Sequence, residues 1–485
     1  MDAEELSLQI IKATRDDCVD VRDVEKLFGK LLSGADIENR LELVQSLIKY
    51  LATGSSFFEL DDSSQNSVIK LLSLLLDKYS IDYILQNFYS LNDLINFINL
   101  TKNNNVFKLI SNLLLKISPI DILSNTELIK ILITKLNDVE LSLGIINSIE
   151  DFIMNLALVN NSELMKRRLL SHEIINLLMS MRNSGKDKQI VRLLDLISNV
   201  YLNFVKDGDI PTYLYSFEFK DFIQDDVMLV VCIIDFHNRV LSKIIEDNNR
   251  LCWLSDKLVN QYEYIVRLLF DQNLADHDNK SFIINEVTIF TTQLSYLPEG
   301  KYFDNLNGKY HIIDRAIDDY TYNDESISLL SKINPNYLMN KQQFLKDFAI
   351  YKVKFIPILN NLIQKESIFE IVKLKNFNTS SLKNLPSLKE LFGVLVVMSS
   401  FKWSTFHLLN HLPSIMNTLL DNAFDIVEPE VFELKKQILA NLIFSNTIEE
   451  LGIWNSKIRE TYSLMLDGKP LKDKDVQVAV YDQFS

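Results

Sequence analysis

Residues that break or sharply turn the backbone are rare in this sequence, whose 485 residues include 11 glycines and 9 prolines. Sandwiches and barrels need turn residues roughly every 8 to 12 positions, and phosphate-binding α/β folds need clustered glycines. The scarcity therefore argues against both classes and favours long helical segments. Hydrophobic residues make up 47% of the chain, so a chain of this length can bury a substantial core.

Two segments place apolar residues at the offsets of one helical face, and they are alike in sequence. Residues 63–80 have Val68, Leu71 and Leu72 at positions i, i+3 and i+4, and residues 102–118 repeat this pattern from Val106. Aligned at a shift of 38, residues 71–80 and 109–118 are identical at six of ten positions. This pattern predicts two amphipathic helices that belong to a repeat.

Similar apolar stripes recur along the first 200 residues. They begin at residues 24, 68, 106, 145 and 190, which are separated by 44, 38, 39 and 45 positions. Further helical patterns lie between them, at residues 36–52, 81–100, 120–137 and 162–180. A period of about 40 residues with two helices is typical of HEAT and armadillo repeats. The fold class that we predict is all-α, a curved α-solenoid of HEAT- or armadillo-like helix pairs with roughly ten to twelve repeats.

The helical pattern also predicts how the chain is divided. It continues to residue 297, so that residues 1–297 are expected to form an N-terminal solenoid. Residues 298–335 hold two Gly, two Pro and many Asp, Asn and Tyr residues, and predict an irregular insertion or a break in the stacking. The pattern resumes in a C-terminal solenoid at residues 336–466, and the polar residues 467–485 are expected to be a disordered tail.

Charge and apolar run length restrict the partners of the chain. The net charge of −15 opposes nonspecific attraction to DNA or to an anionic membrane. The longest apolar run, residues 227–234, is far shorter than the roughly 20 residues of a membrane helix. The acidic residues 1–5 lack a signal-peptide pattern. We expect a cytoplasmic protein, with the nucleus as a further location, and we expect Cys232 and Cys252 to be buried structural thiols.

Catalytic and metal-binding spacings are not recognisable in the sequence. The string from His172 to Asn176 resembles a zinc-protease motif but has Asn in place of the second His. His407 and His411 are spaced i, i+4, yet no third ligand can be assigned to them. The sequence therefore predicts a protein that is not an enzyme and that uses no cofactor or metal.

One line of exposed positions stands out in this acidic protein. Two residues past each stripe start, about 200° from the buried face, the chain has Lys26, Lys70, Lys108, Asn147 and Arg192. On the same exposed arc, Leu115 takes the place that Asp77 has in the preceding repeat. If stacking brings these helices side by side, the row would contact an acidic or polar patch of a protein partner. The alternative interpretation is an ordinary solvated helix face.

Several strings occur in the same order and at similar spacing as in a known yeast family. They are residues 163–169 (ELMKRRL), 191–195 (VRLLD), 333–338 (INPNYL) and 408–413 (LLNHLP), followed by Trp454, Arg459, Tyr462 and Gly468-Lys469. Together they make the chain similar to the HEAT-repeat assembly chaperones for the base of the proteasome regulatory particle. This family is also linked to spontaneous mutability and to DNA mismatch repair. The similarity extends from about residue 36 to about residue 470.

The resemblance implies a function and a set of partners. A member of this family would bind the C-terminal small domain of one AAA ATPase subunit of the proteasome base. It would help to join that subunit to a neighbouring ATPase and to a large non-ATPase subunit, and would leave before the mature proteasome is complete. Any effect on mismatch repair is expected to be indirect, because the acidic composition gives no support for direct DNA binding.

Two other function classes remain as alternatives. The first is a nuclear-transport or adaptor solenoid, which would need acidic, Asn and Trp ladders on its binding face. Here the exposed row is basic, and the three tryptophans, Trp253, Trp403 and Trp454, lie elsewhere. The second is a hydrolase hidden in residues 298–335, for which no catalytic spacing is apparent.

Overall fold

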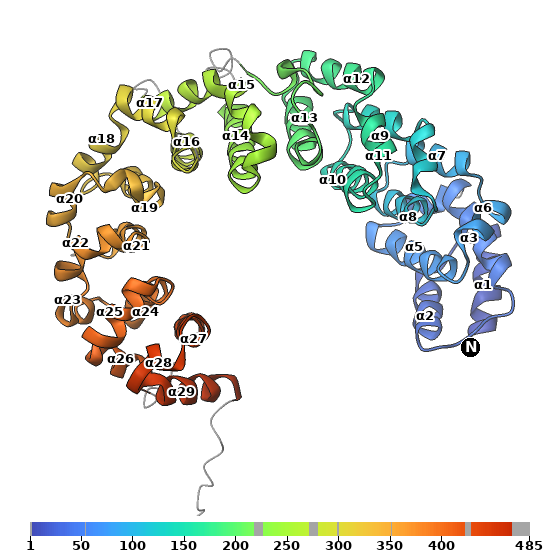
Figure 1. Ribbon diagram of the computed structural model, residues 1–485. Helices are drawn as coiled ribbons and strands as arrows, with labels where there is room; N and C mark the ends of the chain where they lie inside the picture. Colours follow the sequence, from blue (N-terminus) through green and yellow to red (C-terminus); the bar gives the residue numbers. More distant parts are fainter. Residues whose placement is uncertain are drawn as a thin grey trace, which may run out of the picture. The chain divides into compact units, whose positions relative to one another are not determined.

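The computed structural model describes residues 2–53, 55–217, 227–270, 280–297, 300–350, 352–421 and 428–467. Within these ranges all regular secondary structure is helical (Figure 1), and the predicted all-α solenoid class is confirmed. The chain falls into two compact units, residues 1–243 with 249–258 and residues 244–248 with 259–485. The predicted end of the C-terminal solenoid at residue 466 stays a prediction. Of the predicted tail, residues 467–485, Asp467 ends α29 and the rest lies outside the described residues.

The first unit contains the helices that carry the apolar stripes, and these pack one against the next (Figure 1). This stripe row consists of α2 (Val21–Leu32), α5 (Asp62–Leu76), α8 (Asn104–Leu115), α10 (Leu143–Met154) and α13 (Asp187–Asn199). A backing row packs against it, with α1 (Ala3–Arg15), α3 (Arg40–Thr53), α7 (Leu91–Leu100), α9 (Leu128–Leu136) and α12 (His172–Asn183). Shorter elements connect the two rows, namely α4 (Ser55–Glu59), α6 (Ile81–Asn87), η1 (Ile120–Asn125), η2 (Asn155–Val159), α11 (Glu163–Leu169), η3 (Tyr201–Asn203) and η4 (Thr212–Leu214).

Local sequence explains why the stripe helices begin and pack as they do. In α5 the Asp61 carboxylate accepts a hydrogen bond from the backbone N–H of Ser64 at 2.7 Å, which caps the helix start. Val68 and Leu71 are fully buried, and burial of each such side chain contributes about 1.5–3 kcal/mol. In α8 the Asn103 side chain caps the first turn in the same way. Capping and the stripe together fix which face of each helix is exposed.

The second unit repeats this arrangement (Figure 1). One row consists of α16 (Lys280–Leu294), α19 (Asp324–Lys332), α21 (Ile356–Ile363), α24 (Leu388–Met398) and α27 (Pro429–Ser445), which pack in succession. The remaining helices are α17 (Lys301–Tyr310), α18 (Ile312–Asp319), α20 (Gln342–Asp347), α22 (Glu366–Asn376), α23 (Thr379–Lys383), α25 (Lys402–His411), α26 (Pro413–Leu420), α28 (Ile448–Leu451) and α29 (Asn455–Asp467), with the short turns η6 (Leu268–Phe270), η8 (Pro335–Leu338), η9 (Val353–Phe355) and η10 (Gly452–Trp454). Two long helices, α14 (Val227–Glu246) and α15 (Asn248–Arg267), include the division between the units.

The irregular insertion predicted at residues 298–335 is wrong. From residue 300 onward this segment forms α17, α18 and α19, and α19 packs between α16 and α21. His311, with φ of 51°, makes the tight corner between α17 and α18 without a glycine. Asn323 caps α19. The polar residues that suggested a loop are therefore caps, corners and exposed faces of short helices.

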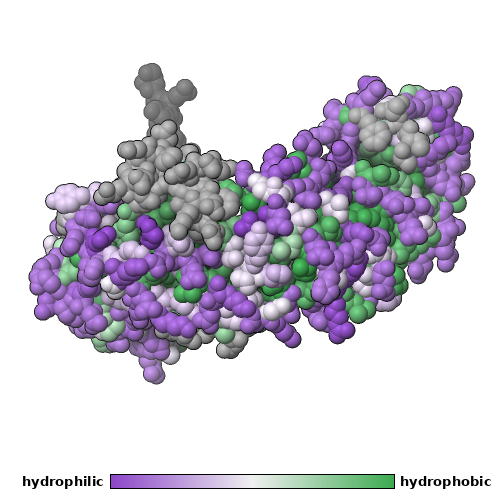
Figure 2. All heavy atoms as spheres, turned by 90° about the horizontal axis from the view of Figure 1, so that it is seen from above, coloured by the Kyte–Doolittle hydropathy of each residue, from purple (hydrophilic) through white to green (hydrophobic). Residues whose placement is uncertain are grey.

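The described surface is mainly polar. Hydrophilic residues cover most of the face seen in Figure 2, with hydrophobic residues visible between them. Among the helices described, none has the length and hydropathy needed to cross a bilayer. The expectation of two buried thiols is wrong, because Cys252 is exposed and Cys232 is half-buried.

Candidate partner-binding surface

The predicted row occupies equivalent positions on consecutive helices of the stripe row. Lys26 lies on α2, Lys70 on α5, Lys108 on α8 and Asn147 on α10, and all four residues are exposed. Because each of these helices buries the apolar stripe that precedes these positions, the four side chains point away from the core. The structure thus places four of the five predicted row residues on the exposed side of adjacent helices.

The three lysines of this surface differ in their electrostatic partners. The Lys26 ammonium lies 3.0 Å from the Asp23 carboxylate, one turn earlier on α2. Lys70 and Lys108 form no ion pair with any residue that the structure describes. An exposed ion pair such as Lys26–Asp23 contributes little to stability. Of the three lysines in this row, Lys70 and Lys108 therefore have ammonium groups that are not already paired with a carboxylate.

Arg192 does not belong to the exposed row, and this part of the prediction is wrong. It is buried, with 6% of its surface exposed. Its Nη1 donates to the carbonyl oxygens of Leu136 (3.0 Å) and Asp138 (2.5 Å), and Nη2 donates to that of Leu141 (3.2 Å). Burial lowers the pKa of the Arg192 guanidinium. The side chain satisfies carbonyls at the end of α9 and in the link to α10, and is held there instead of facing solvent.

Asp77 and Leu115 mark the ends of neighbouring stripe helices. Asp77 is the C-cap residue of α5, and its carboxylate lies 2.5 Å from the ammonium of Lys116, the C-cap residue of α8. Leu115 is half-buried beside it. The sequence reasoning missed Lys116 as the partner of Asp77, although the 38-residue alignment places Lys78 opposite Lys116 and so indicates a shared basic position at this end.

Beyond α8 the stripe row carries a mixed-charge cluster that the sequence reasoning also missed. Arg239 on α14 donates to the Asp195 carboxylate (2.8 Å) and to Ser198 Oγ (2.9 Å), and its Nε lies 3.1 Å from Asp235. Burial, and then the nearby Asp195 carboxylate, raises the pKa of Glu150 to about 7, against a hydrogen bond from Asn199 and the charge of Arg239. Glu150 therefore exchanges its proton near neutral pH, on the same row as the lysines.

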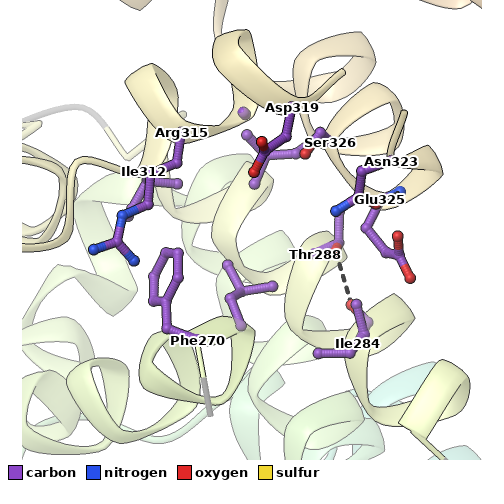
Figure 3. Close-up of a pocket in the computed structure, with 12 residues that line it drawn as sticks. Phe270, Ile284, Thr288, Ile312, Arg315, Asp319, Asn323, Glu325 and Ser326 are labelled. Atoms are coloured by element: carbon purple, nitrogen blue, oxygen red, sulfur yellow. Dashed lines mark hydrogen bonds between the residues drawn. The ribbon is translucent and has the colours of Figure 1, made fainter. Parts of the chain in front are cut away.

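In the second unit a small open depression of about 270 Å³ lies between α16, α18 and α19. Figure 3 shows Arg315 beside Phe270 at one end, and its guanidinium carbon is 4.7 Å from the ring centroid. Ile284 and Ile312 line it, and Thr288 Oγ1 is turned back onto the Ile284 carbonyl at 2.7 Å (Figure 3). The depression can accept one apolar side chain, with charged groups at its edge.

One of the two histidines considered as a metal pair, His407, has a structural role. The His407 Nε2 atom lies 2.8 Å from the carbonyl oxygen of Phe377, at the end of α22. Burial, the largest effect, lowers the pKa of His407. In the described part of the chain, no three His, Cys, Asp or Glu side chains gather as a metal site would require. The His407 contact belongs to the same class as the Arg192 contact, a side chain that binds a helix-terminal carbonyl.

Comparison with known proteins shows that both halves of the chain match domain models of one protein family. Residues 8–242 match the family model described as the N-terminal domain of DNA mismatch repair protein HSM3, and residues 251–485 match the model of its C-terminal domain. A Debaryomyces hansenii protein named DNA mismatch repair protein HSM3 is 28% identical, over 90% of this chain and 86% of its own length. A Candida glabrata protein of the same name is 25% identical, over 93% and 90%.

Proposed function

The chain belongs to the HSM3 family of DNA mismatch repair proteins, and we propose that it acts as a non-enzymatic assembly scaffold for the base of the proteasome regulatory particle. Its first partner would be the C-terminal small domain of one AAA ATPase subunit. A neighbouring ATPase and a large non-ATPase base subunit would then join, and the scaffold would leave before the mature particle is complete. The strings quoted above support this choice of partners, because they match that chaperone family in order and spacing.

The observation that carries this proposal is the exposed lysine row on the stripe helices. Lys26, Lys70 and Lys108 occupy one register on three helices that pack in succession. Each helix is held by its buried stripe, so the surface exists before a partner arrives. A preformed surface binds with a smaller loss of conformational freedom than one that must order on binding. This suits a protein that holds a folded domain and later releases it.

The charges indicate which part of a partner such a surface would meet. The chain has a net charge of −15. A lysine that recurs at the same position of successive helices is therefore opposite in sign to the charge of the chain as a whole. An acidic patch on the partner domain would pair with Lys70 and Lys108, and such pairs guide orientation and association rate more than they raise affinity. Release then requires only that a competing subunit covers the same patch.

The direct test measures binding of the purified full chain to a recombinant ATPase small domain. Lys70→Glu with Lys108→Glu is expected to weaken binding about tenfold at low salt and less at high salt, because the pairs are screened. Lys383→Glu with Lys457→Glu, both exposed positions in the second unit, changes the net charge equally and serves as the matched control. Equal binding of the parent and both variants would exclude the lysine row as the contact surface.

The same experiment separates the remaining functions. Binding of nuclear-transport factors, with none of the ATPase domain, would favour an adaptor solenoid. We place any effect on mismatch repair downstream of the scaffold role, since an acidic chain is repelled by DNA phosphates. A salt-resistant complex of the purified chain with duplex DNA would contradict that view. We propose that the protein acts in the cytoplasm and also in the nucleus.

A further inference from the structure

A polar groove of about 720 Å³ lies between α7 and α9 of the backing row. Four asparagines line it, namely Asn92, Asn96 and Asn99 on α7 and Asn125 in the link before α9. All four are exposed. Ile95 and Ile131 also line the groove, and Ile95 is 5% exposed. The groove therefore carries amide groups at its rim and two isoleucines in its lining, and it is separate from the lysine row on the stripe helices.

The amide groups of these asparagines are available to a ligand. Within the part of the chain that the structure describes, the side chains of Asn92, Asn96, Asn99 and Asn125 form no hydrogen bond. At Asn99 it is the backbone carbonyl, and not the side chain, that accepts from the Lys135 ammonium at 3.0 Å. An Asn side chain offers two N–H donors and a carbonyl acceptor. It therefore carries the same complementary pair as a peptide group.

The interval between Asn92 and Asn96 on α7 is close to that between alternate residues of an extended polypeptide. Asn92 and Asn96 are four residues apart, which is about 6 Å along a helix axis. Two residues of an extended chain span about 6.7 Å, and peptide groups at this interval present their donors and acceptors in the same direction. The ten residues of α7, about 15 Å long, can run alongside four or five extended residues. Ile95 and Ile131 would lie beneath the side chains that turn inward.

The charged groups around the groove are already paired with one another. Lys130 lies 3.2 Å from Glu127 and 2.7 Å from Glu173 on α12, and Glu173 also pairs with Arg168 at 2.8 Å. Buried Lys135 is occupied by the carbonyl oxygens of Asn99 and Thr101. Charge is therefore not what the groove offers to a ligand. We propose that it binds an extended, unfolded segment of another protein through that segment's backbone amides, with little dependence on its sequence.

The first experiment screens the full-length chain against an array of ten-residue peptides of unrelated sequence, and measures the affinity of the best binders by fluorescence polarisation. Asn92→Ala, Asn96→Ala and Asn99→Ala together are expected to weaken binding by about 30-fold or more, because each removes hydrogen bonds to the peptide. The matched control replaces Asn112, Asn410 and Asn417, three other exposed helical asparagines, and is expected to bind like the parent. Alanine favours helix, so the triple variant should keep the parent's circular-dichroism melt.

A second measurement tests the chemistry of recognition. N-methylation at alternate peptide groups of a bound peptide is expected to abolish binding, whereas exchange of its exposed side chains leaves the affinity within about threefold. The proposal is overturned if none of the array peptides binds, if the triple variant binds like the parent, or if N-methylation has no effect. Binding by a peptide of residues 468–485 and by no other would assign the groove to this chain's own terminus and also overturn it. None of these outcomes depends on the ATPase-binding test.

Discussion

Replacing Arg192 by Met tests whether this buried guanidinium joins neighbouring repeats. The substitution keeps a long side chain in place but removes the donors to Leu136, Asp138 and Leu141. The contacts to Leu136 and Leu141 are buried, and a buried carbonyl without a donor costs about 1–3 kcal/mol. Part of this cost is offset, because the charged group no longer has to be desolvated. We expect Arg192→Met to lower the free energy of unfolding by about 2–4 kcal/mol in total.

The loss can be measured globally and locally. Urea unfolding of the parent and of Arg192→Met gives the change in free energy, and hydrogen exchange over residues 136–141 shows whether the opening is local, as repeat proteins often unfold in parts. Arg192→Lys retains the charge without the planar guanidinium, and its free energy of unfolding is expected to lie between those of the parent and of Arg192→Met. Arg167→Met, at an exposed arginine on α11, is the control and should change stability by less than about 0.5 kcal/mol.

One result would refute the reasoning. If Arg192→Met unfolds within about 0.5 kcal/mol of the parent, and exchange at residues 136–141 is unchanged, then the carbonyls at the end of α9 find other donors or water at little cost. The guanidinium would then not stabilise the packing between the repeats, and burial of Arg192 could not be used to explain the stacking of α13 on the preceding repeat.

Two further predictions use other buried groups. In the folded protein the pKa of Glu150 is about 7, above the unfolded value, so its contribution to stability is present below about pH 4.5 and is lost as the pH rises toward 7. Glu150→Gln should therefore raise the urea midpoint at pH 8 and have little effect on it near pH 4. The control Glu140→Gln, at an exposed position, should leave the midpoint unchanged at both pH values, and an effect of Glu150→Gln that does not depend on pH would contradict the assignment. Trp454 Nε1 donates to the Leu409 carbonyl at 2.9 Å in a buried contact. Trp454→Phe should therefore lower the free energy of unfolding by about 1–3 kcal/mol and speed amide hydrogen exchange at the end of α25. Unchanged exchange at the end of α25 would contradict this role of Trp454.

Sequence periodicity predicted the fold class and the orientation of the stripe helices, because an amphipathic helix buries its apolar face whatever its neighbours are. Helix limits were less predictable. The predicted helix over residues 81–100 is divided into α6 and α7. Ser90 begins α7 with a capping box to Asp93, a local signal that the apolar pattern alone does not contain. The exposed polar residues of α17 to α19 misled the reading of residues 298–335 for a similar reason.

The candidate surface was only partly predictable, since position on a helix does not determine what lies above it. Lys70 and Lys108 are exposed as their position predicts, whereas Arg192, in the same register, is covered by the link between α9 and α10. The Arg192 side chain reaches carbonyls at the end of α9 and in this link, and nothing in the stripe period indicates that. The Glu150 cluster joins Glu150, Asp195 and Arg239, which are 45 and 44 positions apart. The period therefore brings their helices side by side, but it does not indicate which side chains meet.

Arg192 is one case of a contact that recurs in both units and explains how the helices keep their register. In the second unit Asn361 on α21 donates to the carbonyl oxygens of Leu330 (2.9 Å) and Ile333 (2.8 Å) at the end of α19. Trp403 on α25 donates to that of Ile363 at the end of α21 (2.9 Å). Helix ends leave carbonyls without partners, and these side chains supply the missing donors from a neighbouring helix. A directional hydrogen bond to a helix end forms at one position only, so these polar side chains fix the stacking register on which a preformed binding surface depends.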